Sequence, residues 1–240
     1  MRYLTCTFIL FVFGCLFYSC GPTRFVEPLK RGENAVSAGL GGPMVNVPGI
    51  ATLPLPFSSI TYGRGITENI TAYGSWFPTA AVFGVLQLDG GATYGVWQSK
   101  NIKHGVSTTA GFNFAVDRFE SNARFWPQLD AHYYWKYNAR AQQQDDLLIK
   151  GGTPRGNLLY AGVGTWYELK GKRAHDQKQQ TRIVPMLNIG HDFNTRRWTF
   201  KTEIKLIAPF SSNEDIVVDY RSITGRFGAT GIYFGITRRF

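Results

Sequence analysis

Apolar and polar side chains alternate along segments of about ten residues, and this alternation constrains the fold more than any other feature of the chain. Successive side chains of a β-strand point to opposite faces, so each such segment predicts a strand with one apolar and one polar face. Residues 105–117 are the clearest case, and 128–137 and 198–208 repeat the pattern. In the first segment the apolar face is formed by Val106, Ala110, Phe112, Phe114 and Val116, and the other face by Ser107, Thr109, Gly111, Asn113 and Asp117.

Weaker segments extend the pattern along the chain, and short and long connections alternate between them. Such alternation is typical of up-and-down barrels, whose short turns and long loops lie at opposite ends. The sequence therefore predicts an all-β fold, a closed antiparallel up-and-down transmembrane β-barrel of about 10 strands, with 8–12 compatible. The predicted strands cover about 34–42, 55–64, 67–77, 85–98, 104–117, 124–137, 156–169, 181–194, 197–209 and 229–240.

Alternation alone does not say which face is the inner one. A soluble barrel turns its apolar side chains inward, whereas a membrane barrel turns them to lipid and must close, because unpaired backbone groups in hydrocarbon cost several kcal/mol. The aromatic fraction of 15% favours the membrane version, with outer-membrane lipid as a partner. We expect aromatic girdles from Trp76, Phe77, Trp97, Trp126, Trp135, Trp166 and Trp198.

The first residues match a secretory signal peptide. Arg2 precedes an apolar run, Leu4 to Tyr18, that is shorter than the ~20 residues of a membrane helix. Residues 16–20 (LFYSC) resemble a lipobox, which implies cleavage before Cys20 and lipidation of its sulfur; Cys15, or an unlipidated signal peptide, is the alternative. The predicted division is a signal peptide at 1–19, a linker at 20–33 and a barrel domain at 34–240, lipid-anchored in the outer membrane with both termini in the periplasm.

The final strand carries a further signal. Its alternating apolar residues end in a terminal phenylalanine, and the segment resembles the C-terminal recognition strand read by the barrel assembly machinery, an expected partner. Arg238 departs from that pattern and is expected to reach into the headgroup layer. The residues that carry the resemblance are Ile232, Phe234, Ile236 and Phe240.

Several segments together resemble small outer-membrane barrel lipoproteins of Gram-negative bacteria, a group described only as hypothetical or porin-like. They are PLKRGENAVSAGLGGP, SITYGRGITENITAYGSWF, RFWPQLDAHYYWKY, GTWYEL, EIKLIAPF and GIYFGITRRF. The resemblance implies fold and location and brings no catalytic residue. It favours a non-enzymatic barrel with a structural role, an accessory role in an envelope complex, or a narrow porin-like transport role.

Charged residues of both signs are predicted to face the lumen. Ten strands make a narrow barrel, whose interior is mostly filled by side chains. These charges predict either a mutually neutralising plug, because unpaired buried charges are costly, or the polar lining of a narrow conduit. They are Asp89, Asp130, Lys136, Glu168, Asp192, Lys201, Glu203, Lys205 and Arg239.

Asp130 and His132 share the predicted inner face and are the weak catalytic candidates. A carboxylate beside an imidazole is the arrangement that general-base catalysis requires. The alternative function is therefore an outer-membrane hydrolase, either similar to the omptins, which this chain matches in strand count only, or lipid-modifying through Ser107 and His104. A third alternative is a soluble periplasmic lipoprotein barrel.

Other classes of function find little support in the sequence. The net charge of +10 fits a solvated rim or attraction to anionic headgroups, and no nucleic-acid-binding motif accompanies it. All three cysteines precede residue 21, and no cofactor motif occurs, so neither a metal site nor a cofactor is expected. The loop 210–228 is expected to fold over the barrel mouth or to dock a partner strand.

Overall fold

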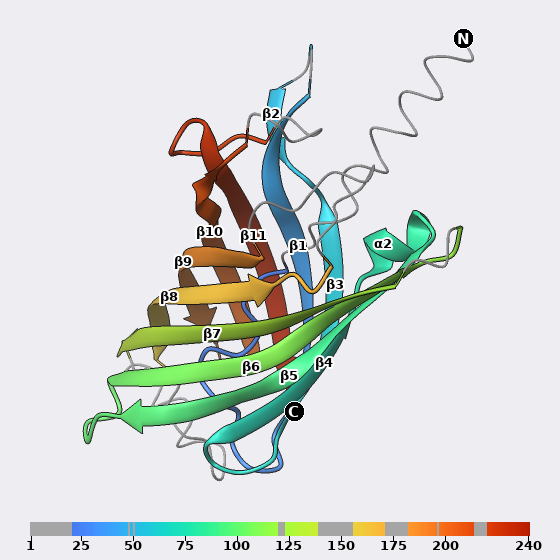
Figure 1. Cartoon of the computed structure of the whole chain (residues 1–240). Coiled ribbons are helices and arrows are strands. Elements are labelled where there is room, and N and C mark those ends of the chain that lie inside the picture. Colours follow the sequence, from blue (N-terminus) through green and yellow to red (C-terminus); the bar gives the residue numbers. More distant parts are fainter. Residues whose placement is uncertain are drawn as a thin grey trace.

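The computed structural model describes residues 21–47, 49, 51–119, 123–138, 156–170, 182–195, 197–213 and 220–240. Its main feature is a closed antiparallel barrel (Figure 1), in which ten strands follow one another in sequence order and β11 returns to pair with β1. The predicted barrel is thus confirmed. The strands are β1 (Asn34–Val47), β3 (Phe57–Gly65), β4 (Ile70–Trp76), β5 (Val85–Gln98), β6 (His104–Asp117), β7 (Ala123–Tyr137), β8 (Asn157–Tyr167), β9 (Ile183–Asn194), β10 (Trp198–Ser212) and β11 (Phe227–Arg239).

Strand β1 closes the barrel by pairing on both of its edges. On one edge Ala35 to Pro43 pair with Gly231 to Arg239, and the other edge pairs with β3. Two reciprocal 3.0 Å hydrogen bonds between the backbones of Asn34 and Phe240 fasten the ends of this seam. The backbone groups along the seam are therefore paired, as a strand in hydrocarbon requires.

The two ends of the barrel differ, as the alternating connections predict, except that the long connection from Tyr137 to Asn157 joins β7 to β8 at the end of the short ones. The short connections at 66–69 and 99–103 lie at the same end as the C-terminus, which we call the turn end. The opposite end, the loop end, carries the short strand β2 (Ala51–Pro54) and the one-turn helix α2 (Pro78–Val82) (Figure 1). No helix among the described residues is long and apolar enough to cross a membrane.

Both loop-end elements lie where the sequence predicts only loops. Strand β1 runs on to Val47 and forms a hairpin with β2, in which Val45 pairs with Leu53. Tyr220 bridges to Val45 from the connection between β10 and β11, so part of the loop 210–228 packs over this hairpin. The apolar core of that loop, at 216–218, and the long connection 139–155 lie outside the described residues.

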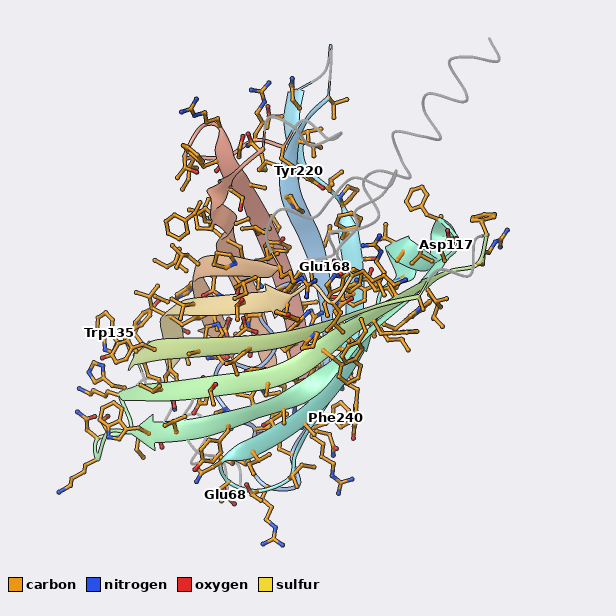
Figure 2. The ribbon with its side chains drawn as sticks, in the orientation of Figure 1. Glu68, Asp117, Trp135, Glu168, Tyr220 and Phe240 are labelled. Atoms are coloured by element: carbon orange, nitrogen blue, oxygen red, sulfur yellow. The ribbon has the colours of Figure 1, made fainter. Side chains whose placement is uncertain are left out.

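Large apolar side chains cover the outside of the barrel, and the inside holds the charged and many of the polar side chains together with a few apolar clusters. Along β10, Phe200 and Ile204 are 48% and 47% exposed, whereas Lys201 and Glu203 are only 6% and 2% exposed. Trp135 projects outward from the wall in Figure 2. This distribution is the reverse of that in a soluble barrel.

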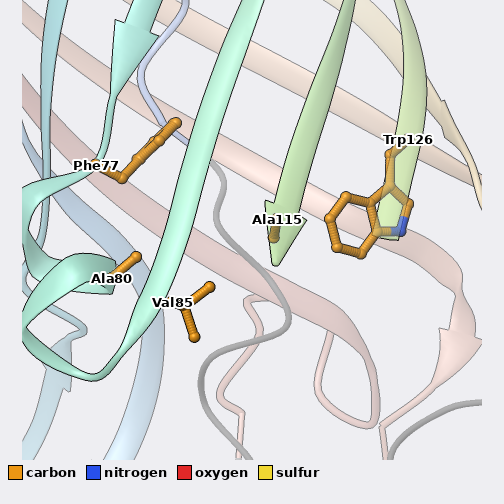
Figure 3. Close-up of a cluster of buried hydrophobic side chains, with 5 residues drawn as sticks. All are labelled: Phe77, Ala80, Val85, Ala115 and Trp126. Atoms are coloured by element: carbon orange, nitrogen blue, oxygen red, sulfur yellow. The ribbon is translucent and has the colours of Figure 1, made fainter. Parts of the chain in front are cut away.

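The predicted aromatic girdle is only partly correct. Trp76, Trp97, Trp135 and Trp198 are exposed on the outer surface, but Phe77, Trp126 and Trp166 are buried inside. Phe77 and Trp126 form an apolar cluster with Ala80, Val85 and Ala115, beneath α2 (Figure 3). The indole N–H of Trp126 donates to Glu168 at 2.7 Å, which satisfies its only donor inside the barrel. An aromatic residue near a strand end can face either the lumen or the outside, because neighbouring residues of a strand point to opposite sides.

Candidate functional site

The lumen contains part of the chain itself. Residues 21–30, here called the lumenal segment, contact inward-facing side chains of opposite walls. Thr23 bonds to Glu203 on β10, while Arg24 bonds to Asp89 on β5. From Gly21 the segment runs towards the turn end, where Glu33 leads into β1. The sequence assigns these residues to a linker, and no local alternation of side chains places them within the barrel.

Side chains of β10 bind the backbone of the lumenal segment. The ammonium group of Lys201 donates to the carbonyl oxygens of Thr23 and Arg24, at 2.7 and 3.0 Å. Lys205 donates to the carbonyl oxygen of Gly21 at 2.9 Å, and Glu203 accepts the backbone N–H of Thr23 at 3.1 Å. These charged groups replace the hydrogen bonds that the extended segment would make to water.

Two ion pairs add to this backbone binding. Arg24 lies 2.5 Å from Asp89, and the two side chains are 7% and 9% exposed. Glu27 pairs with Lys136 of β7. Because an isolated buried charge is strongly disfavoured, Asp89 and Lys136 depend on the segment for their neutralisation.

Apolar residues of the segment fit specific places in the wall. Val26 packs with Tyr134, Leu158 and Tyr160, and is 1% exposed. The ring of Phe25 occupies the space that a side chain at Gly63 would fill. The wall therefore matches the side chains of the segment as well as its backbone.

The remaining predicted lumen charges lie as follows. Lys201 is 3.5 Å from Asp192, Lys205 is 3.2 Å from Glu203, and Glu168 is 3.6 Å from Arg124, so these pairs join residues of the wall. Arg239 lines a cavity of about 410 Å³ at the turn end, together with Glu27 to Lys30 of the segment. Asp130 lines a small cavity of about 40 Å³ beside Gly21 to Arg24.

Asp130 and His132 both lie in the lumen, where their side chains have different neighbours. His132 is 2% exposed; its Nε2 lies 3.0 Å from the amide nitrogen of Asn188, and its ring meets Tyr160 edge-on. Asp130 packs against Gly164 instead. Among the described residues no hydrogen bond joins the two side chains, and the lumenal segment lies against the cavity beside Asp130. The geometry is that of packed wall residues.

The other enzymatic candidates are also separated. Ser107 is fully buried in the lumen, whereas His104 bonds to the hydroxyl of Tyr133 at 2.7 Å on the outer surface. Within the described part of the chain, no group of three or more His, Cys, Asp or Glu residues is arranged to bind a metal.

The structure describes the predicted assembly signal at the C-terminus but not the predicted lipidation site near the N-terminus. Cys20 and Cys15 lie outside the described residues. Phe234, Ile236 and Phe240 are exposed on the outer face of the last strand, and Ile232 is partly so. The guanidinium of Arg238 lies 5.6 Å from the centre of the Trp198 ring, a cation–π contact on the outer surface at the turn end.

No family model matches the sequence, and no curated protein matches it. The fold is similar to solved barrels. An outer membrane channel from Pseudomonas putida F1 is 10% identical over 91% of this chain and 99% of that one, with a TM-score of 0.44. The transport unit of the autotransporter AIDA-I from Escherichia coli is 9% identical over 97% and 96%, with a TM-score of 0.40. The outer membrane protein OprG from Pseudomonas aeruginosa is 10% identical over 90% and 99%, with a TM-score of 0.35.

Proposed function

We propose that this chain is an integral outer-membrane β-barrel whose lumen is closed by its own N-terminal segment, and that it serves as a narrow conduit or as an accessory subunit of an envelope complex. One observation carries the proposal. The apolar side chains face outward, while charged wall residues and the lumenal segment occupy the interior.

The outer surface supports a position within a bilayer. Strands β5 and β6 have 14 residues each. A strand of that length tilted by about 40° rises roughly 35 Å, which exceeds the ~25 Å apolar band of outer-membrane barrels. Leu129, Val163 and Ile189 are among the outward side chains, each more than half exposed. In water this surface would be a large aggregation-prone patch.

The interior supports a barrel without a permanent open channel. Lys201 and Glu203 bind the segment from one wall, and Asp89 binds it from the other, so the segment crosses the space that solutes would use. Transport through this lumen requires the segment to move. A structural or accessory role requires no such movement.

Location and anchoring complete the proposal. The turn end would face the periplasm, as short turns do in outer-membrane barrels. Lipid attachment at Cys20 and assembly through the terminal strand remain predictions. Mass spectrometry of the N-terminal peptide, compared with that of Cys20→Ala, tests the first of them.

Reconstitution tests the proposal as a whole. Detergent-extracted Cys20→Ala protein, which cannot carry the predicted lipid on residue 20, should show heat-modifiable gel mobility, insert into liposomes and give no porin-like conductance steps in planar bilayers. Protein that stays soluble and monodisperse without detergent would refute the membrane barrel. Large, constant conductance would refute the closed lumen while leaving the membrane barrel intact.

A further inference from the structure

We infer that the lumenal wall is a binding site for an extended peptide, and that the lumenal segment is its exchangeable occupant, released through the turn end by rotation about Gly32. This inference rests on the proposed function.

The barrel does not depend on the segment for its own closure. β1 and β11 pair directly from Ala35 to Arg239. In the described structure, the backbone of residues 21–29 forms its hydrogen bonds to the wall with side chains, such as those of Lys201 and Thr71. Within the described ranges it forms none with the backbone of a strand. Removal of the segment therefore breaks side-chain contacts and leaves the strand ladders intact.

The wall offers a row of distinct subsites. Asp89 binds a basic side chain, the gap at Gly63 receives an aromatic ring, and Lys136 binds an acidic side chain. Tyr134, Leu158 and Tyr160 pack against an aliphatic side chain, that of Val26. The ligand class is thus an extended peptide with the order basic, aromatic, aliphatic, acidic, which is the order of Arg24 to Glu27.

The local geometry sets the direction of release. Gly32 has φ of +78°, and no atom lies within 4 Å of the position that a side chain would occupy there. Because glycine has no side chain, this residue can adopt other backbone conformations. Rotation here breaks the 2.8 Å hydrogen bond from the Gly32 N–H to the carbonyl oxygen of Gly65. The cavity of about 410 Å³ adjoins Glu27 to Lys30 at the turn end and provides space for the first movement. The chain continues into β1 at this same end, so withdrawal of the segment leads out through the turn end.

The wall can tolerate the loss of its occupant. Lys201 and Lys205 each have a carboxylate of the wall, Asp192 and Glu203, within 3.5 Å. Water entering the lumen would hydrate Asp89 and Lys136. These groups face the lumen rather than lipid, so they would not be stranded in hydrocarbon.

The experiment separates the segment from the full-length protein after folding. A recognition sequence for a specific protease is inserted between Arg31 and Gly32, both of which are exposed. After cleavage and a wash in high salt with moderate urea, the barrel should keep its heat-modifiable mobility and lose the N-terminal fragment. A fluorescein-labelled synthetic peptide of residues 21–30 should then bind and should be displaced by the unlabelled peptide.

A charge swap tests the recognition. The Arg24→Glu peptide should bind the barrel about tenfold or more weakly, since a charge-assisted pair is lost and like charges meet. The Asp89→Arg barrel should restore its binding. The Lys30→Ala peptide is the matched control and should bind like the parent, because among the described residues Arg24 and Glu27, and not Lys30, form the ion pairs between the segment and the wall.

Each outcome has a defined meaning. The inference would be overturned if the fragment left only when the barrel unfolds, or if the parent and Arg24→Glu peptides bound equally well. Neither result would contradict the membrane barrel, because the heat-modifiable band is measured separately. A cleaved protein that never shows this band in detergent would instead count against the proposed function.

Discussion

At the scale of single residues, Glu203 holds three groups together in the lumen. Its carboxylate accepts hydrogen bonds from the Thr23 backbone and, at 2.5 Å, from the Tyr160 hydroxyl, and it lies 3.2 Å from Lys205. With 2% of its surface exposed, it has little access to water that could replace these partners. The residue links the lumenal segment to two strands of the wall.

Glu203→Ala should therefore lower the free energy of unfolding by about 3 kcal/mol, the usual cost of removing one partner from a buried charge network. Urea unfolding in detergent or lipid, followed by the heat-modifiable gel band, measures the change. Glu68→Ala is the matched control: this carboxylate is exposed at the turn end, and its loss should cost no more than about 0.5 kcal/mol. Equal effects of the two substitutions would show that the Glu203 contacts contribute nothing.

Among the strands, several cross-strand pairs join a glycine to a tyrosine, and in two of them the tyrosine ring covers the glycine. Gly105 of β6 faces Tyr134 of β7, and Gly190 of β9 faces Tyr160 of β8. In each pair the tyrosine ring lies where a side chain on the glycine would stand. These rings form part of the surface against which Val26 packs.

Gly190→Val should force the Tyr160 ring away from the wall and cost about 1–3 kcal/mol, as overpacking of a filled interior does. It should also weaken the hold on the lumenal segment, which limited proteolysis at the exposed Arg31 would report as faster cleavage. Gly74→Val on the outer surface is the control and should do neither. Unchanged stability and cleavage in the Gly190 variant would contradict the packing described for Tyr160.

Strand orientation also predicts how substitutions depend on depth. Ile204 lies midway along the outward-facing side of β10, whereas Trp198 begins that strand at the turn end. Ile204→Lys should cost about 2–4 kcal/mol in a bilayer and Trp198→Lys about 1 kcal/mol or less from the added charge alone, because the penalty falls towards the interface. Urea titrations in liposomes measure both, and equal costs would argue against a membrane position for β10.

The strands were predictable because their signal is local. Alternation along 104–117 or 124–137 needs no knowledge of a partner strand, and the structure places β6 and β7 within a residue of those ranges. The lumenal segment was not predictable in this way. Its partners Asp89 and Glu203 lie 65 and 180 residues away in sequence, and no local period relates them. The one available sign was composition, since Phe25, Val26 and Leu29 are apolar for an exposed linker.

In the molecule as a whole, the predicted lipid anchor and the lumenal segment require different positions of the same residues. The anchor requires residue 20 near the bilayer, and the segment requires residue 21 inside the barrel. Cys20 is covalently joined to Gly21, whose carbonyl accepts a hydrogen bond from Lys205 in the middle of β10. Consecutive Cα atoms are 3.8 Å apart, so a lipid on Cys20 reaches the bilayer only if Gly21 leaves this position. Anchoring at Cys20 would thus favour the withdrawn form.

A crosslink tests this coupling. The Thr23 hydroxyl lies 3.0 Å from the Asn188 amide, so Thr23→Cys with Asn188→Cys should form a disulfide when the segment is in the lumen. In a Cys20→Ala background we expect nearly complete crosslinking, and in lipidated protein much less. Similar crosslinking in both proteins would show that lipidation of Cys20 does not affect the position of the segment.

We expect the apolar side of every strand to face lipid, and nitroxide scanning of β10 in liposomes distinguishes this orientation from its reverse. Labels are placed singly at positions 199–206 in a Cys20→Ala background, and collisions with oxygen, which partitions into lipid, are compared with those of a water-soluble nickel chelate. Lipid-facing side chains should give high oxygen accessibility at 200, 202, 204 and 206 and low accessibility at the positions between them. Oxygen accessibility that lacks this period of two, or that peaks at 201, 203 and 205, would contradict this orientation.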